Sequence, residues 1–199
     1  MKMVLASKNA HKLTEMRSIL GELGVEVVLE SDVGLDVAVE ETGTTFEENA
    51  VLKAVAVMKA GNLPAIADDS GLCVTALGGG PGVYSARYGG EGLTDRDRYN
   101  LVLDGLRGEI DRSAKFVSVI ACAFPNGDVL TCRGECPGMI SSVPMGEDGF
   151  GYDPVFFVPE KKMTFAQMTS EEKNAISHRG VALRRFGRML SKYLEEKKG

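Results

Sequence analysis

Short apolar runs alternate with longer stretches of helical periodicity over the first third of the chain, which restricts the fold to one that combines strands with helices. The last of these runs ends abruptly in Asp68, Asp69 and Ser70, and polar residues at a strand end indicate a site. The expected elements are strands at 1–6, 25–29 and 64–67 and helices over 13–23 and 45–60, with Gly24 and Gly61 as C-terminal stops.

The second half of the chain predicts a hairpin followed by helical structure. Asn126-Gly127 lies between two apolar runs and is a strong signal for a tight hairpin turn, so this half is expected to be antiparallel at least in part. Thr94 and Asp97 have the spacing of a capping box at a helix start. The expected elements are a helix at 94–106, strands at 116–124, 129–132 and 155–158, and helical structure from Thr169 onward with a break near Ser177.

Charge and composition exclude several classes of protein. With 44% hydrophobic and 26% charged residues among 199, the chain has the profile of a globular protein, and one domain is expected. Its net charge of -5 argues against binding of nucleic acid or of an anionic membrane through the overall charge of the protein. No uncharged apolar run approaches the ~18 residues of a membrane span, and no signal peptide is apparent, so we expect a cytoplasmic protein.

The four cysteines are not spaced for a metal site. They form no CxxC pair, and only two histidines are present to complete a zinc site. We therefore expect four free thiols, most of them buried as small apolar side chains. The cysteines are Cys73, Cys122, Cys132 and Cys136.

Three sets of polar residues are candidates for a functional site. Ser7, Asn9 and Lys12 lie at a strand-to-helix turn, where free backbone N–H groups and the helix dipole favour an anion such as a phosphate. The alternative is that Ser7 and Asn9 only cap the helix and that Lys12 is solvated.

The second group is acidic and consists of Glu41, Asp68 and Asp69. Carboxylates are ligands that Mg²⁺ prefers, commonly one or two of them together with substrate phosphates. A carboxylate beside the metal can also orient or deprotonate an attacking water. The alternative is a solvated acidic face, with Asp68 or Asp69 capping the next turn.

The third group combines residues 150–153 with Lys173, His178 and Arg179. An aromatic ring can stack on a base while Asp, His and Arg side chains read its edge, and a lysine can meet a phosphate. The alternative is that Phe150 belongs to the core and that Lys173 lies on an exposed helical turn.

Taken together, these segments resemble the inosine triphosphate pyrophosphatase family, the non-canonical purine NTP pyrophosphatases. Two departures are that position 8 is Lys where many members have Gly, and that position 152 is Tyr rather than Trp. The matching stretches are residues 7–12, 41–53, 67–72, 81–88, 150–153 and 172–179, which span nearly the whole chain.

The resemblance implies a fold, an activity and an assembly. The fold is an α/β architecture with an elongated mixed sheet flanked by helices and a cleft between two lobes, formed by a single domain over residues 1–199. The activity is Mg²⁺-dependent hydrolysis of ITP, dITP and XTP to the monophosphate and pyrophosphate, and the assembly is a homodimer. Two alternatives are a non-catalytic purine nucleotide sensor and, disfavoured by the net charge, an RNA-binding module.

The resemblance also implies roles for individual residues. Glu41 and Asp69 would bind Mg²⁺, with Asp69 also the proton acceptor. The residues that would hold the triphosphate or otherwise touch substrate are Ser7, Lys8, Asn9, Ala10, His11, Lys12, Lys53, Ser70 and Lys173. The residues that would form the base pocket are Phe150, Gly151, Tyr152, Asp153, His178 and Arg179.

Overall fold

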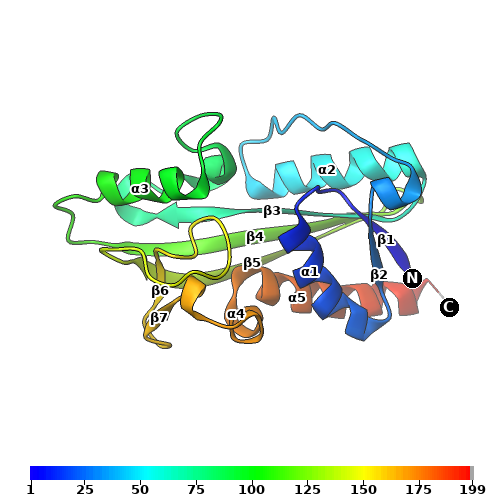
Figure 1. Cartoon of the computed structure of the whole chain (residues 1–199). Helices are drawn as coiled ribbons and strands as arrows, with labels where there is room; N and C mark the ends of the chain where they lie inside the picture. The colour runs from blue at the N-terminus through cyan, green and yellow to red at the C-terminus, as the bar shows by residue number, and fades with distance from the viewer. Residues whose placement is uncertain (198–199) are drawn as a thin grey trace. The chain divides into compact units, whose positions relative to one another are not determined.

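A seven-stranded sheet in the order β2-β1-β3-β4-β5-β6-β7 runs through the computed structural model, which describes residues 1–197 (Figure 1). β1 pairs in parallel with β2 and β3, whereas β6 pairs antiparallel with β5 and β7, so the sheet is mixed and the protein is of the α/β class. The strands are β1 (Lys2–Leu5), β2 (Glu26–Leu29), β3 (Ala65–Val74), β4 (Ser113–Ala123), β5 (Val129–Ile140), β6 (Phe156–Val158) and β7 (Met163–Thr164). The helices are α1 (Ala10–Leu20), α2 (Phe46–Gly61), α3 (Asp95–Gly105), α4 (Ser170–Ile176) and α5 (His178–Glu196).

The chain divides into two compact units. Unit 1 contains residues 1–69, 118–134 and 179–199, and unit 2 contains residues 70–117 and 135–178. The strands β3, β4 and β5 each contribute residues to both units. That the units form a single domain stays a prediction.

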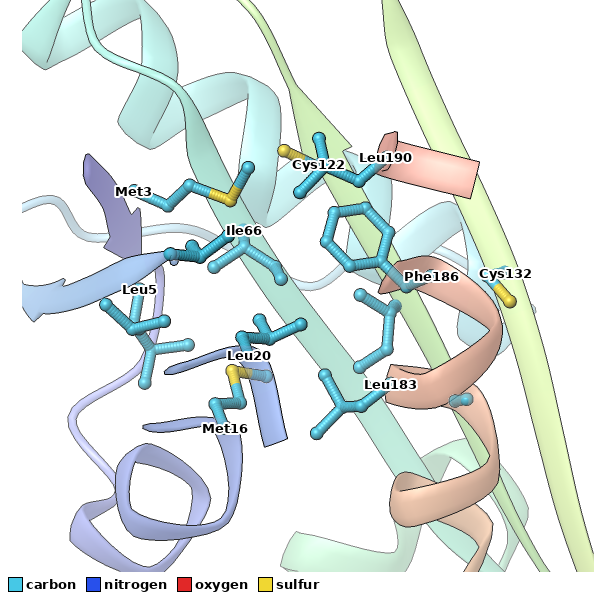
Figure 2. Packing of buried hydrophobic residues seen from close by; sticks show 14 of the residues in the cluster. Met3, Leu5, Met16, Leu20, Ile66, Cys122, Cys132, Leu183, Phe186 and Leu190 are labelled. Carbon is cyan, nitrogen blue, oxygen red and sulfur yellow. The ribbon is translucent and has the colours of Figure 1, made fainter. Parts of the chain in front are cut away.

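The core of unit 1 follows from the alternation of side chains along its strands. Successive strand residues point to opposite faces, and alternating residues of β1 (Met3 and Leu5) and of the end of β4 (Ile120 and Cys122) enter one buried cluster. Helices α1 and α5 supply the other side of that cluster through their apolar stripes. Figure 2 shows the packing of Met3, Leu5, Met16, Leu20, Ile66, Cys122, Leu183, Phe186 and Leu190.

Helix α2 covers the other face of these strands (Figure 1). The strand residues that alternate with the cluster are small, namely Ala65, Ala67, Ala121 and Ala123, and all are buried. The helix itself buries Ala50 and Ala54 and takes no part in the first cluster. Small side chains on both surfaces let the helix axis approach the sheet closely. Lys53 of α2 can therefore reach Asp69 of β3.

Unit 2 has a separate core rich in aromatic rings. Phe116, Phe156 and Phe165 contact one another, with ring centroids 4.6 to 5.7 Å apart. Leu72 and Val74 of β3 join the same cluster. Tyr152 belongs to this core as well, so the core anchors the segment at residues 150–153.

The local signals for helix starts and for the hairpin are confirmed. The capping box expected at Thr94 is present, the helices expected from Thr45 and Thr169 also begin with capping boxes, and Ser177 interrupts the C-terminal helical stretch as expected. The turn at residues 125–128 joins β4 to β5, with Gly127 at a φ of +92°. All four cysteines carry thiols, and three of them are buried. None of the helices described at 1–197 is long and apolar enough to cross a membrane.

Three expectations at element ends are corrected. Gly61 does not stop α2 but is its last residue, and Asn62 takes the left-handed position at φ +48°. A Cβ at Gly61 would lie 2.7 Å from Leu35 Cδ1, so a larger residue there would displace the end of that side chain. β3 does not end at Asp68 but continues to Val74, because the polar residues find partners within the fold. The strand at 156–158 is not the last, since β7 pairs with it.

Candidate functional site

Lys53 lies between two carboxylates in unit 1. Its Nζ is 2.7 Å from Oε1 of Glu41 and 2.7 Å from Oδ1 of Asp69, and it donates to the carbonyl oxygen of Asp68 at 3.2 Å. Burial opposes the charge on Lys53, but Asp69 and Glu41 outweigh it and raise the pKa of the ammonium above its ordinary value. A fixed positive charge therefore joins the two carboxylates predicted to bind metal.

Asp69 keeps one carboxylate oxygen available. Its Oδ2 is buried and accepts no hydrogen bond from the described residues 1–197. Burial raises the pKa of Asp69, with Glu41 adding to the effect and Lys53 opposing it. Since buried carboxylate oxygens are usually hydrogen-bonded, Oδ2 is suited to a ligand such as a water or a cation.

Asp68 has a different role from its neighbour, because adjacent strand residues point to opposite faces. Its side chain is fully buried and accepts hydrogen bonds from Nε of Arg179 and, at 3.4 Å, from Oγ of Ser118. Arg179 also donates to Glu15 on α1. Although burial opposes its charge, these two carboxylates raise the pKa of the Arg179 guanidinium. Asp68 is thus neutralised inside the protein, which leaves Asp69 as the available carboxylate.

The turn between β1 and α1 is capped by Asn9. Its Oδ1 accepts from the N–H groups of His11 and Lys12 at 2.9 and 3.3 Å, and Oγ of Ser7 accepts from Asn9 N–H at 3.2 Å. Asn9 therefore caps α1, and phosphate binding by this turn stays a prediction. Lys8 is exposed, and its Nζ lies 2.6 Å from Asp36.

Lys12 is not solvated, contrary to the alternative interpretation. Its Nζ donates to the carbonyl oxygen of Asp68 at 3.0 Å, and the side chain is 16% exposed. Burial lowers the pKa of Lys12, while the Asp68 carboxylate acts in the opposite direction. Lys12 and Lys53 therefore meet at one carbonyl oxygen, next to Asp69.

In unit 2, Asp153 and Lys173 form a buried pair. Oδ2 of Asp153 accepts from Lys173 Nζ at 2.7 Å and from the N–H of Phe150 at 2.9 Å. The Lys173 ammonium also lies 4.6 Å from the centroid of the Phe150 ring. The alternative of an exposed Lys173 on a helical turn is wrong, because α4 buries this side chain.

A glycine that the sequence does not single out makes this pair possible. Gly149 has a φ of +78°, and a Cβ there would lie 2.1 Å from Oδ2 of Asp153. Its neighbour Gly151 donates its N–H to Asp95 at 2.8 Å. The sequence shows a glycine-bearing loop ahead of residues 150–153, but it does not show which residues each glycine contacts.

His178 and Tyr152 both pack against the core of unit 2. The His178 ring stacks on Phe116, with centroids 4.6 Å apart and planes 11° from parallel. Tyr152 is only 5% exposed, and its hydroxyl donates to the carbonyl oxygen of Ser85 at 2.7 Å. Burial raises the pKa of this hydroxyl. The structure thus gives Tyr152, expected in the base pocket, a core position with a satisfied polar end.

Replacing Tyr152 with phenylalanine tests that position. The ring stays in the core and only the hydrogen bond to Ser85 is lost, so the free energy of unfolding is expected to fall by about 1 kcal/mol. Chemical denaturation measures this change. Turnover of dITP, the substrate that the resemblance implies, is expected to stay near the wild-type value, and a tenfold rise in KM would instead assign the hydroxyl to substrate.

The remaining predicted residues lie beside these groups. Ala10 and His11 begin α1, and Ser70 is half-buried in β3. The sequence does not predict Glu15 and Ser118, which bind Arg179 and Asp68 in the buried ion cluster of Asp68, Arg179 and Glu15. Neither carries a local signal, since their partners Arg179 and Asp68 are far away in the sequence.

The donor set of unit 1 fits a magnesium ion that is completed by substrate. Glu41 and Asp69 offer carboxylate oxygens around Lys53, and Oδ2 of Asp69 is available. No group of three or more His, Cys, Asp or Glu residues suited to a metal occurs within residues 1–197. Mg²⁺ needs no such group, because one or two carboxylates together with phosphates and waters satisfy it.

Comparison with known proteins places the chain in a family. Residues 3–189 match the Ham1 family, and the protein belongs to it. A dITP/XTP pyrophosphatase of Shigella flexneri is 51% identical over 187 residues, which cover 92% of this chain and 94% of the relative. One of Thermus thermophilus is 52% identical over 187 residues, covering 92% and 89%.

Solved structures share the fold. The Ham1 protein of Staphylococcus aureus superposes with a TM-score of 0.88 at 42% identity, covering 97% of this chain and all of the other. A HAM1 protein from Coxiella burnetii gives a TM-score of 0.89 at 44% identity, covering 96% and 99%. The expected mixed sheet with flanking helices is therefore confirmed.

Proposed function

We propose that this protein hydrolyses dITP, ITP and XTP to the nucleoside monophosphate and pyrophosphate. The observation that carries the proposal is the buried Asp69 carboxylate, which is bound to Lys53 on one oxygen and available on the other. The relatives that are about half identical to this chain carry the name dITP/XTP pyrophosphatase, which supports the same reaction here. The proposed function is removal of deaminated purine nucleotides from the nucleotide pool.

The residues of unit 1 are suited to attack by water on the α-phosphorus. Oδ2 of Asp69 is the group that would orient the water and take its proton, since burial raises the pKa of this carboxyl toward the working range of a base. Lys53 and Lys12 would place positive charge beside the phosphates. Glu41 and Asp69 would hold Mg²⁺, which when bound supplies charge neutralisation for the leaving pyrophosphate.

Base selection is proposed to follow from the oxygen at C6. Hypoxanthine and xanthine present an acceptor there, whereas adenine presents an amino donor. A donor such as His178 left unpaired against adenine costs about 1–3 kcal/mol, which separates the substrates by about tenfold to a hundredfold. Phe150, Asp153 and Lys173 support this pocket as one hydrogen-bonded group.

The first test is product analysis. The protein is incubated with dITP, ITP, XTP, GTP or ATP and Mg²⁺, with a metal-free control, and the products are separated by chromatography. Monophosphate and pyrophosphate from dITP, ITP and XTP, with little from ATP or GTP, are expected. Diphosphate and phosphate would contradict attack at the α-phosphorus. Tight dITP binding without turnover would favour the alternative, a nucleotide sensor.

We also propose that the protein acts as a cytoplasmic homodimer that binds neither nucleic acid nor membrane. The net charge of -5 supports the absence of a polyanion partner. Light scattering coupled to size-exclusion chromatography measures the mass directly. A mass of twice 21.3 kDa is expected, and a mass of 21.3 kDa would contradict the dimer.

A further inference from the structure

Asn49 contacts the loop that follows Glu41. The residue is fully buried on α2, and its Oδ1 accepts the backbone N–H of Gly43 at 2.8 Å. Asn49 and Lys53 are i and i+4, so their side chains share one face of the helix. Two contacts therefore hold the 41–43 segment on one face of α2. Lys53 binds the Glu41 carboxylate, and Asn49 binds the backbone N–H of Gly43.

The contact between Gly43 and α2 is close. A Cβ at Gly43 would lie 2.6 Å from Oδ1 of Asn49 and 2.7 Å from Cβ of Glu48, so the loop approaches the helix only because this residue is glycine. The next two amides, those of Thr44 and Thr45, donate to Oε2 of Glu48 at 2.7 and 3.1 Å. Two adjacent side chains of α2 thus bind three successive amides of the loop.

Folding stability alone does not account for an asparagine at this position. Its Nδ2 is buried and has no hydrogen-bond partner within residues 1–197. An unpaired buried donor costs about as much as the bond to Gly43 contributes, so the two effects nearly cancel in the free energy of folding. The bond to Gly43 nevertheless fixes the backbone, and only Thr42 separates Gly43 from Glu41.

We propose that Asn49 is a positioning residue that holds the Glu41 carboxylate beside Lys53 and Asp69, where the two carboxylates bind the metal ion. This inference rests on the proposed function. Asn49 itself touches neither metal nor substrate in this role and acts through the backbone of residues 41–43. Loss of the bond is expected to weaken metal binding more than it slows turnover at saturating metal.

The test uses two variants that break the contact from opposite sides. Asn49→Leu keeps the approximate size but removes the acceptor, and Gly43→Ala pushes the loop away from α2. For both, the Mg²⁺ concentration that gives half-maximal dITP hydrolysis is expected to rise about tenfold, with kcat at saturating Mg²⁺ changed less than about threefold. Exchange of the Gly43 amide hydrogen, followed by NMR, is expected to be about tenfold faster.

Two matched variants serve as controls. Asn49→Asp keeps Oδ1, so the Gly43 amide is expected to stay protected from exchange. Gly21→Ala is a glycine replacement in unit 1 at a helical φ of -60° with no atom within 4 Å of the added carbon, and it is expected to change neither this exchange nor the Mg²⁺ requirement.

A wild-type Mg²⁺ requirement in Asn49→Leu overturns the proposal, whether or not the Gly43 amide exchanges faster. Titration of Mn²⁺, followed by electron paramagnetic resonance, gives a readout without turnover, and about tenfold weaker binding is expected in Asn49→Leu. If the wild type hydrolyses no nucleotide, the proposed function fails, and the Mn²⁺ titration still decides the role of Asn49. Equal Mn²⁺ affinity in the wild type and Asn49→Leu overturns that role.

Discussion

Replacing Asp69 with asparagine is expected to lower kcat for dITP about a thousandfold or more. An amide keeps the oxygen that accepts from Lys53 at 2.7 Å but can neither take a proton nor supply a second anionic oxygen. Burial that raises the pKa of Asp69 also means that the neutral amide is well tolerated, so the fold should be retained. Pyrophosphate release measures the rate, and thermal unfolding checks the fold.

A second aspartate provides the control for this variant. Asp104 is exposed on α3 and pairs with Arg107 at 2.7 Å, so Asp104→Asn is expected to hydrolyse dITP at the wild-type rate. Retention of more than about a tenth of the activity in Asp69→Asn would remove Asp69 from the role of proton acceptor.

Replacing Arg179 with alanine is expected to lower the free energy of unfolding by about 3–5 kcal/mol. The guanidinium is buried against the carboxylates of Asp68 and Glu15, and its removal leaves both without this cation. Urea unfolding at pH 7 measures this loss.

Arg185 supplies the matched arginine on the same helix. It is exposed and donates to the carbonyl oxygen of Arg133 at 2.8 Å, so Arg185→Ala is expected to cost less than about 1 kcal/mol. A loss below about 1 kcal/mol for Arg179→Ala would show that the buried ion cluster is not required for folding. Turnover of ITP and of ATP by Arg179→Ala is then measured at a temperature at which the variant is folded. A larger loss of kcat/KM on ITP than on ATP supports recognition of the base by Arg179.

The sequence predicts the regular elements well where a local rule applies. Thr45, Thr94 and Thr169 are capping-box residues with their partner three positions later, and Asn126-Gly127 forms the expected turn. These signals depend only on neighbours along the chain, so tertiary packing did not alter them.

Assignments that depend on distant partners could not be made from the sequence. Asp68 and Asp69 are identical neighbours in the sequence, and only their distant partners, Arg179 for Asp68 and Lys53 for Asp69, distinguish them. Tyr152 matches a pattern typical of base recognition, yet packing in unit 2 buries its ring. The sequence therefore shows which segments form the candidate site, through their resemblance to the family. Which side chains contact one another depends on the tertiary fold and could not be predicted.

Unit 1 begins at the first residue and is completed by the last helix. Arg179 reaches back 111 positions to Asp68, and Leu183 and Phe186 complete the apolar cluster started by β1 and α1. During synthesis, Glu41 and Asp69 therefore leave the ribosome well before the helix that completes unit 1. Until α5 is made, the chain has neither the cation for Asp68 nor the cover for its core, so this half of the candidate site forms late in folding.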